Sequence, residues 1–184
     1  MRTSVAYSLL SMVAAIFFFQ GSVWAQTKDV IQRVIGKDKA IIIRERGKDH
    51  TYNFEDDLRL YEIEQVKLLF RNYVNGKLYL LMYVEGSSRG GGNGQCGAGQ
   101  EEYLIWQALD SKWAQDDYRV ELIASCFVDI GGVDSEPYVS GQGKLTAKYV
   151  DSRDDVANTL TYDSAKPEKA WTIQRKPILA SGPH

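Results

Sequence analysis

The sequence predicts an all-β protein: a single, mainly antiparallel sandwich or barrel-like domain of about seven or eight strands with at most one or two short helices. Three observations lead to this prediction: apolar runs of strand length, an Asn-Gly pair between two of them, and an ordinary globular composition. The 184 residues are 44% hydrophobic and 25% charged, with 16 Gly and 4 Pro. This composition excludes collagen-like and wholly disordered chains.

The expected strands follow one another with turn residues between them. Asn75-Gly76 separates two apolar runs, and this pair is the strongest short signal for a β-hairpin because both residues tolerate a positive φ. The run at 78–84 is apolar at every position, which suits a central strand buried on both faces or a strand with a tyrosine-lined outer face. The expected strands are Ala40–Arg46, Val66–Val74, Lys77–Val84, Glu102–Leu109, Arg119–Ile130, Lys144–Val150, Asn158–Tyr162 and Ala170–Arg175.

Two further expectations concern details of these elements. The even positions of 119–130 are all apolar, and this alternation places Cys126 on the core face of its strand. Helix signals are weak: residues 29–35 fit a short helix or the start of a strand, and charged residues at helical spacing in 56–66 allow another helical turn or two.

The first 25 residues predict a secretory signal peptide. Arg2 precedes an apolar run over 5–19, and small residues precede a cleavage site after residue 25. The apolar run is shorter than the roughly 20 residues that span a bilayer. We therefore expect an exported domain over 26–184, with a short tail from about residue 178 and no membrane insertion after cleavage. The expected location is the periplasm, with the extracellular space as the alternative.

The two cysteines predict a disulfide. Cys96 and Cys126 are the only cysteines of an exported chain, and an even cysteine count in an oxidising compartment favours pairing. Closing a loop of about 30 residues stabilises a fold by roughly 3–4 kcal/mol on the chain-entropy model. The spacing is not that of a redox-active CxxC pair, and two thiols with two scattered histidines make no zinc site.

A glycine-rich segment, 87–100, joins two of the strongest strand signals. It lacks the Lys and hydroxyl of a phosphate-binding loop, and a strand rather than a helix follows it, so nucleotide binding is not indicated. The segment fits a long hairpin loop with unusual backbone angles. It also fits a projecting contact loop over 87–95 with Arg89 and Asn93 as binding residues. An exposed arginine in such a loop can bind a partner's carboxylate through two hydrogen bonds.

The chemistry of the remaining residues argues against catalysis. His50 lies in a polar, turn-like stretch without a nucleophile motif, and the carboxylate pairs are sequence neighbours that point to opposite faces of a strand. We expect no catalytic residues, no metal and no cofactor. A net charge of −2 gives no electrostatic footprint for nucleic acid. Trp113, in a polar segment between strands, is either a contact residue or a cap on the end of the sheet.

These observations favour an exported, non-enzymatic binding protein with another protein as its partner. At the level of class, a small exported β-domain with one disulfide resembles the inhibitors and immunity proteins that protect the cell-wall compartment. This resemblance implies a secreted or periplasmic hydrolase as the partner, blocked through the 87–95 loop and Trp113. The alternatives are a carbohydrate- or small-ligand-binding module and a small carboxylate-dependent hydrolase.

Overall fold

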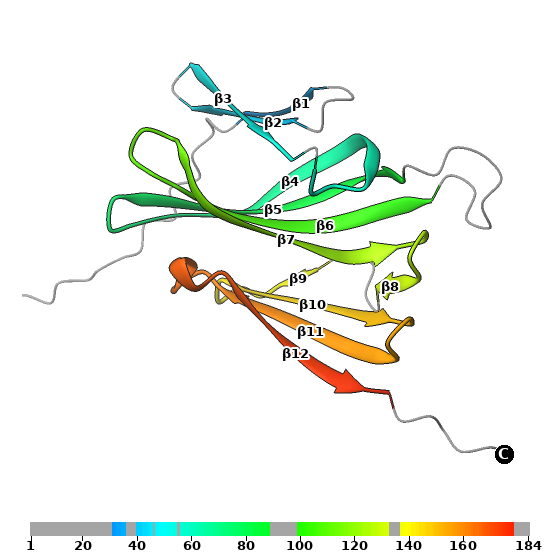
Figure 1. Ribbon diagram of the computed structural model, residues 1–184. Helices are drawn as coiled ribbons and strands as arrows, with labels where there is room; N and C mark the ends of the chain where they lie inside the picture. The colour runs from blue at the N-terminus through cyan, green and yellow to red at the C-terminus, as the bar shows by residue number, and fades with distance from the viewer. Residues whose placement is uncertain are drawn as a thin grey trace, which may run out of the picture.

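The computed structural model describes residues 31–35, 40–45, 47–54, 56–88, 99–132 and 137–178. These residues form two antiparallel sheets and one short 3₁₀ helix at Pro167–Lys169, which confirms the expected all-β, sandwich-like class (Figure 1). The described part of the chain contains twelve strands, more than the sequence predicts, because several additional strands are very short. It contains no helix long and apolar enough to cross a membrane.

The larger sheet has nine strands in the order β12-β11-β10-β8-β7-β6-β5-β4, with β9 paired to β10. It folds over on itself, so that β10–β12 lie beneath β4–β7 in Figure 1. The two halves are connected through β8, which shares one register pair with β7 and three with β10. The strands are β4 (Leu60–Val74), β5 (Lys77–Ser88), β6 (Gln100–Leu109), β7 (Gln115–Ser125), β8 (Ile130–Gly132), β9 (Tyr138–Val139), β10 (Lys144–Asp151), β11 (Val156–Asp163) and β12 (Trp171–Pro177).

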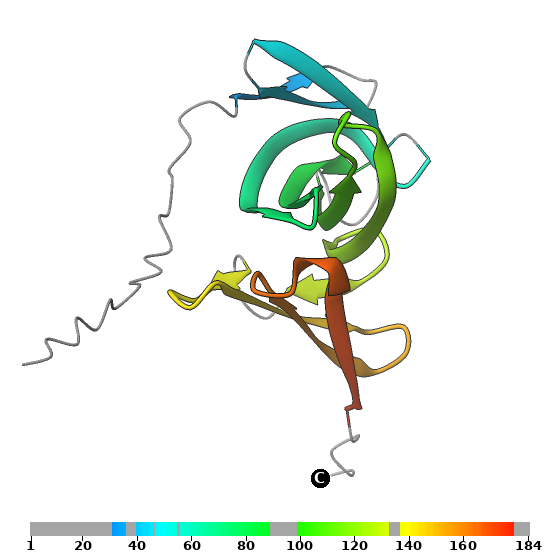
Figure 2. The same ribbon diagram turned by 90° about the vertical axis from the view of Figure 1, so that its left-hand side faces the viewer.

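A three-stranded sheet of β1 (Ile31–Ile35), β2 (Ala40–Glu45) and β3 (Lys48–Asn53) covers the opposite face of β4–β7. Figure 2 shows the resulting layers, with β4–β7 strongly curled between the small sheet and β10–β12. Residues 29–35 thus contribute a strand from Ile31, not a helix. The segment expected to hold helical turns at 56–66 forms one turn, in which the Leu58 N–H donates to the Phe54 carbonyl at 3.0 Å, and no helix follows because β4 begins at Leu60.

The strands β5 and β6 are buried on both faces. Side chains that alternate along each strand belong to two different cores, as period-two geometry requires. This confirms the first of the two alternatives for residues 78–84. The core between β4–β7 and β10–β12 contains Tyr79, Leu81, Tyr83, Leu104, Trp106 and Ala108. The core under the small sheet receives Leu78, Leu80, Met82, Val84, Tyr103 and Ile105.

The expected hairpin between β4 and β5 is confirmed. Asn75 has φ 51° and Gly76 φ 77°, so both residues adopt the left-handed conformation that a tight two-residue hairpin turn demands. The expected last pair of strands is also present as β11 and β12, which are antiparallel neighbours.

The prediction that Cys126 faces the core is wrong. The strand ends at Ser125, and Cys126 is exposed in the turn that follows. One hydrogen bond and one backbone angle define this turn. The Val128 N–H donates to Ser125 Oγ at 3.1 Å, and Asp129 adopts a left-handed conformation with φ 56°. Alternating residues point to opposite faces only within a strand. Since β7 ends at Ser125, the apolar alternation does not predict the direction of the Cys126 side chain.

A close approach between β4 and β5 makes one glycine indispensable. The two strands are paired with three register shifts, and a Cβ added to Gly86 would lie 2.1 Å from the Glu62 carbonyl oxygen. The backbone atom cannot move away as a flexible side chain could, so the strands would have to separate.

We therefore expect Gly86→Ala to lower the free energy of unfolding by about 1–3 kcal/mol, the usual cost of overpacking. Urea denaturation measures this change. Gly131→Ala is the matched control, since a Cβ there meets nothing within 4 Å. Equal stability of the two variants would contradict the close approach.

Candidate functional site

The base of the expected contact loop and Trp113 lie at opposite ends of β6. Arg89, Asn93 and Cys96 lie outside the described residues, as does the expected signal peptide. The base of their loop is described: the Ser88 N–H donates to the Gly99 carbonyl at 2.8 Å, where β5 ends and β6 begins. Trp113 lies beyond the other end of β6. This strand has ten residues and is therefore roughly 30 Å long when measured along the chain. The structure therefore does not bring Trp113 to the base of the loop.

Trp113 is held by its neighbours at that other end. Its ring stacks on His50 with the centroids 4.2 Å apart, and its carbonyl accepts a hydrogen bond from the Tyr52 hydroxyl at 3.1 Å. The side chain is partly buried against the core under the small sheet. This packing favours the cap on the sheet end, and a contact role for Trp113 stays a prediction.

Several connections converge at the end of the sheet that carries the loop base, which we call the loop end. The β7–β8 turn (126–129) and the β10–β11 turn (152–155) lie together on the right in Figure 1. The Ser152 N–H donates to the Asp129 carbonyl at 3.1 Å and joins the two turns. Phe127 projects from the first turn with 69% of its surface exposed, the largest exposed fraction among the described apolar side chains.

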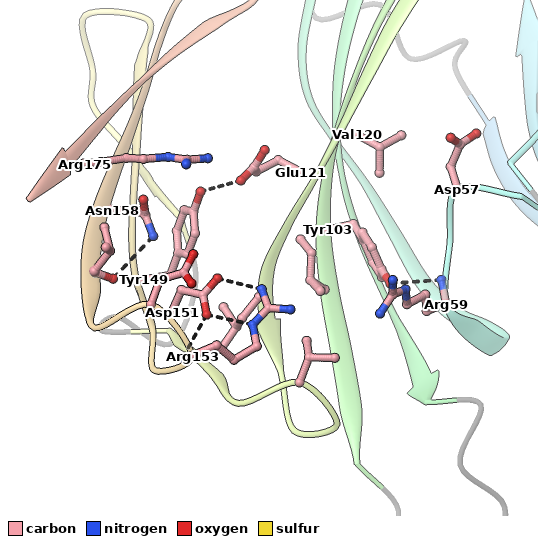
Figure 3. Close-up of a pocket in the computed structure, with 15 residues that line it drawn as sticks. Asp57, Arg59, Tyr103, Val120, Glu121, Tyr149, Asp151, Arg153, Asn158 and Arg175 are labelled. Atoms are coloured by element: carbon pink, nitrogen blue, oxygen red, sulfur yellow. Dashed lines mark hydrogen bonds and ion pairs between the residues drawn. The ribbon is translucent and has the colours of Figure 1, made fainter. Parts of the chain in front are cut away.

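A cleft of about 400 Å³ opens at the loop end, between β7 and the strands β10–β12 (Figure 3). The lining combines charged groups with an apolar wall. The apolar side chains are Val120, Leu122, Val128, Ile130 and Val156. No sequence pattern predicts this cleft, because its lining comes from separate strands and turns that only the fold-over of the sheet brings together.

A row of three polar side chains crosses β10, β11 and β12 on the cleft side. Tyr149 is the register partner of Asn158, and Asn158 is the register partner of Arg175. Side chains directly opposite each other on neighbouring strands share a face, with Cβ atoms about 5 Å apart. The row faces Glu121 of β7, and the Tyr149 hydroxyl donates a hydrogen bond to Glu121 Oε1 (Figure 3).

Burial and hydrogen bonding set the charges of the cleft. Burial raises the pKa of Glu121, and the Tyr149 hydrogen bond and the charge of Arg175 only partly oppose that shift. At the rim, the Arg153 guanidinium donates to both oxygens of Asp151, at 2.8 and 2.6 Å. This hydrogen bonding lowers the pKa of Asp151. The cleft therefore contains one carboxyl group that protonates easily and one that resists protonation.

The donor set of the cleft suits binding of polar groups. Within the described residues, the lining includes no histidine, cysteine or serine. No group of three His, Cys, Asp or Glu side chains there is placed to hold a metal ion. The lining consists of guanidinium donors, carboxylate acceptors, a tyrosine, an asparagine and apolar side chains.

Glu121→Gln tests the electrostatics of the cleft. A raised pKa means that folding favours protonated Glu121, so its contribution to stability is complete below the ordinary pKa of 4.5 and is lost as the pH rises through the raised value. Gln keeps an acceptor for the Tyr149 hydroxyl without a charge.

We expect the variant to be more stable than the wild type at neutral pH, and the difference to disappear in acid below pH 4.5. Urea denaturation across this pH range measures the difference. A difference that is independent of pH, or that favours the wild type at neutral pH, would contradict the raised pKa.

No family model, curated protein sequence or solved structure matches this chain. The function proposed below is therefore inferred from the positions, contacts and charges of the chain's own residues.

Proposed function

We propose that this chain is an exported, non-enzymatic binding protein that contacts a protein partner through the loop end. The partner class to test first is a secreted or periplasmic hydrolase that acts on the cell wall. One observation carries the proposal: the base of the 87–95 loop, the exposed ring of Phe127 and the guanidinium-lined rim of the cleft converge at one end of the sheet.

Phe127 has the properties of an interface anchor. A large aromatic side chain that is 69% exposed can bury much apolar surface in a partner's pocket. Its turn is joined by hydrogen bonds to Ser125 and to the neighbouring β10–β11 turn, so little conformational freedom is lost on binding.

Cys126 lies directly before Phe127 in this turn, and it is one of the two cysteines of the expected disulfide. The described part of the chain holds no free cysteine. Pairing with Cys96 stays a proposal, because Cys96 lies outside the described residues. Such a disulfide would tie the 87–95 loop to the turn of Phe127 and so fix both parts of the contact surface. Two free thiols in the denatured, unreduced protein would disprove it.

Arg153 adds a charged contact at the rim. Its side chain is 52% exposed, and exposed ion pairs contribute only about 0–1 kcal/mol. A carboxylate of the partner can therefore compete with Asp151 for the guanidinium at low cost. A guanidinium binds a carboxylate through two parallel hydrogen bonds, so the partner would replace the bidentate contact that Asp151 makes.

The hydrolase alternative is favoured by a single observation. Glu121 and Asp151 line one cleft with pKa values shifted in opposite directions, as in an acid and base pair. Against it, both oxygens of Asp151 accept hydrogen bonds from Arg153, so this carboxylate is not free to activate water. We therefore expect neither the wild type nor Asp151→Asn to hydrolyse cell-wall polymer, and turnover lost in the variant would favour the enzyme.

The binding function is tested by capture and affinity measurement. Tagged protein over 26–184 is incubated with extracytoplasmic extract, and the affinity of the captured partner is then measured against variants. We expect Arg89→Ala and Phe127→Ala each to weaken binding by about tenfold or more, the effect of losing an interface hot spot.

Tyr73→Ala is the matched control. Tyr73 is also an aromatic residue, is 68% exposed, and lies at the opposite end of β4, beside the Asn75-Gly76 turn. We expect its removal to leave the affinity unchanged. Equal affinity of all variants, or equal losses from Tyr73→Ala and Phe127→Ala, would refute a contact at the loop end.

A further inference from the structure

Two opposite charges face each other across the cleft without pairing. Figure 3 shows the Arg175 guanidinium and the Glu121 carboxylate on opposing walls. No hydrogen bond or ion pair joins them, although the charge of Arg175 lowers the pKa of Glu121 and so acts across the gap. Among the described residues, Arg44 closes on Asp49 and Arg153 on Asp151, whereas Arg59, Arg119 and Arg175 form no ion pair with a described carboxylate. Of these three, Arg175 is the one that faces Glu121 across the cleft.

The fold holds these two charges apart. The register of β12 places Arg175 opposite Asn158, on the cleft face of the strand, where its side chain is exposed. Glu121 belongs to β7 in the other half of the sheet, and the Tyr149 hydroxyl holds its Oε1. Its Oε2 accepts no hydrogen bond from the described residues. The gap therefore has a side that can only donate hydrogen bonds, at Arg175, and a side that can only accept them, at Glu121.

The two sides specify the polar groups of a ligand. A guanidinium binds a carboxylate more strongly than it binds a neutral acceptor, and a carboxylate likewise prefers an ammonium donor. A molecule that carries both groups close together satisfies both walls at once and adds no net charge to the cleft. Asn158, 6% exposed and beside Arg175, offers a further amide donor to the carboxylate.

The volume and the apolar lining of the cleft indicate the size of the ligand and the type of side chain that it carries. A volume of about 400 Å³ lies near the lower end of ligand cavities, which suits a small molecule. The wall beside the charged groups is apolar, with Val128, Ile130 and Val156 among its residues. An apolar side chain on the ligand would remove this wall from water.

We propose that the cleft binds a free α-amino acid with an apolar side chain. Arg175 binds its carboxylate, Glu121 binds its ammonium group, and the valine- and isoleucine-lined wall receives its side chain. This site goes beyond the proposed contact with a protein partner and does not rest on it.

Calorimetric titration of the wild-type protein tests the proposal with three probes. L-Leucine carries both charges, N-acetyl-L-leucine lacks the ammonium group, and L-leucinamide lacks the carboxylate. We expect saturable binding of leucine, and affinities about tenfold or more lower for each blocked probe, since each loses a charged hydrogen-bonding partner. Absence of leucine binding, or equal binding of all three probes, would overturn the proposal.

Three variants assign the roles of the two walls. We expect Arg175→Gln to weaken binding of leucine but not of leucinamide, and Glu121→Gln to weaken binding of leucine but not of N-acetyl-leucine. Lys176→Gln is the matched control: it removes the same charge one residue along β12, where the side chain points to the other face. Urea denaturation of each variant verifies folding.

Equal losses in Arg175→Gln and Lys176→Gln would show non-specific attraction and overturn the site. Loss of leucine binding in Arg175→Gln with unchanged discrimination between leucine and leucinamide would also overturn it, because the carboxylate would then not be bound by Arg175.

Discussion

The structure depends on the burial of β5 and β6 on both faces. Strands that are apolar at successive positions expose hydrophobic surface on each side, and each fully buried large side chain contributes about 1.5–3 kcal/mol. Two covering layers are therefore required. The small sheet of β1–β3 supplies one, and β10–β12 supply the other by folding back beneath β4–β7.

The fold-over that completes the second core also creates the cleft. The three residues of β8 connect the halves of the nine-stranded sheet, and the two halves separate next to this short connection. Near the loop end, the facing positions are occupied by polar residues: Glu121 on one side, and Tyr149, Asn158 and Arg175 on the other. The folded sheet thus has an apolar core, with Trp106 and Trp171, at its centre and a polar cleft at its end.

The sequence was sufficient for features that depend on local patterns. The Asn75-Gly76 hairpin follows from the conformational tolerance of two adjacent residues, and the burial of 78–84 follows from apolarity at consecutive positions. The exposure of Cys126 was not predictable from alternation, because a single turn formed by Ser125 and Asp129 ended the strand early. The cleft was beyond sequence reasoning for a different reason: Glu121 and Arg175 come to face each other only through the register of three strands and the folding of the sheet.

Both proposals depend on the contact between the halves of the sheet at the cleft. A double-mutant cycle on Glu121 and Tyr149 measures that contact most directly, with Glu121→Ala, Tyr149→Phe and the double variant compared by urea denaturation at neutral pH. The hydrogen bond between the two side chains predicts a coupling free energy of about 0.5–3 kcal/mol, the range found for residues in contact. Additive effects of the two substitutions would contradict the meeting of β7 and β10, and with it the cleft.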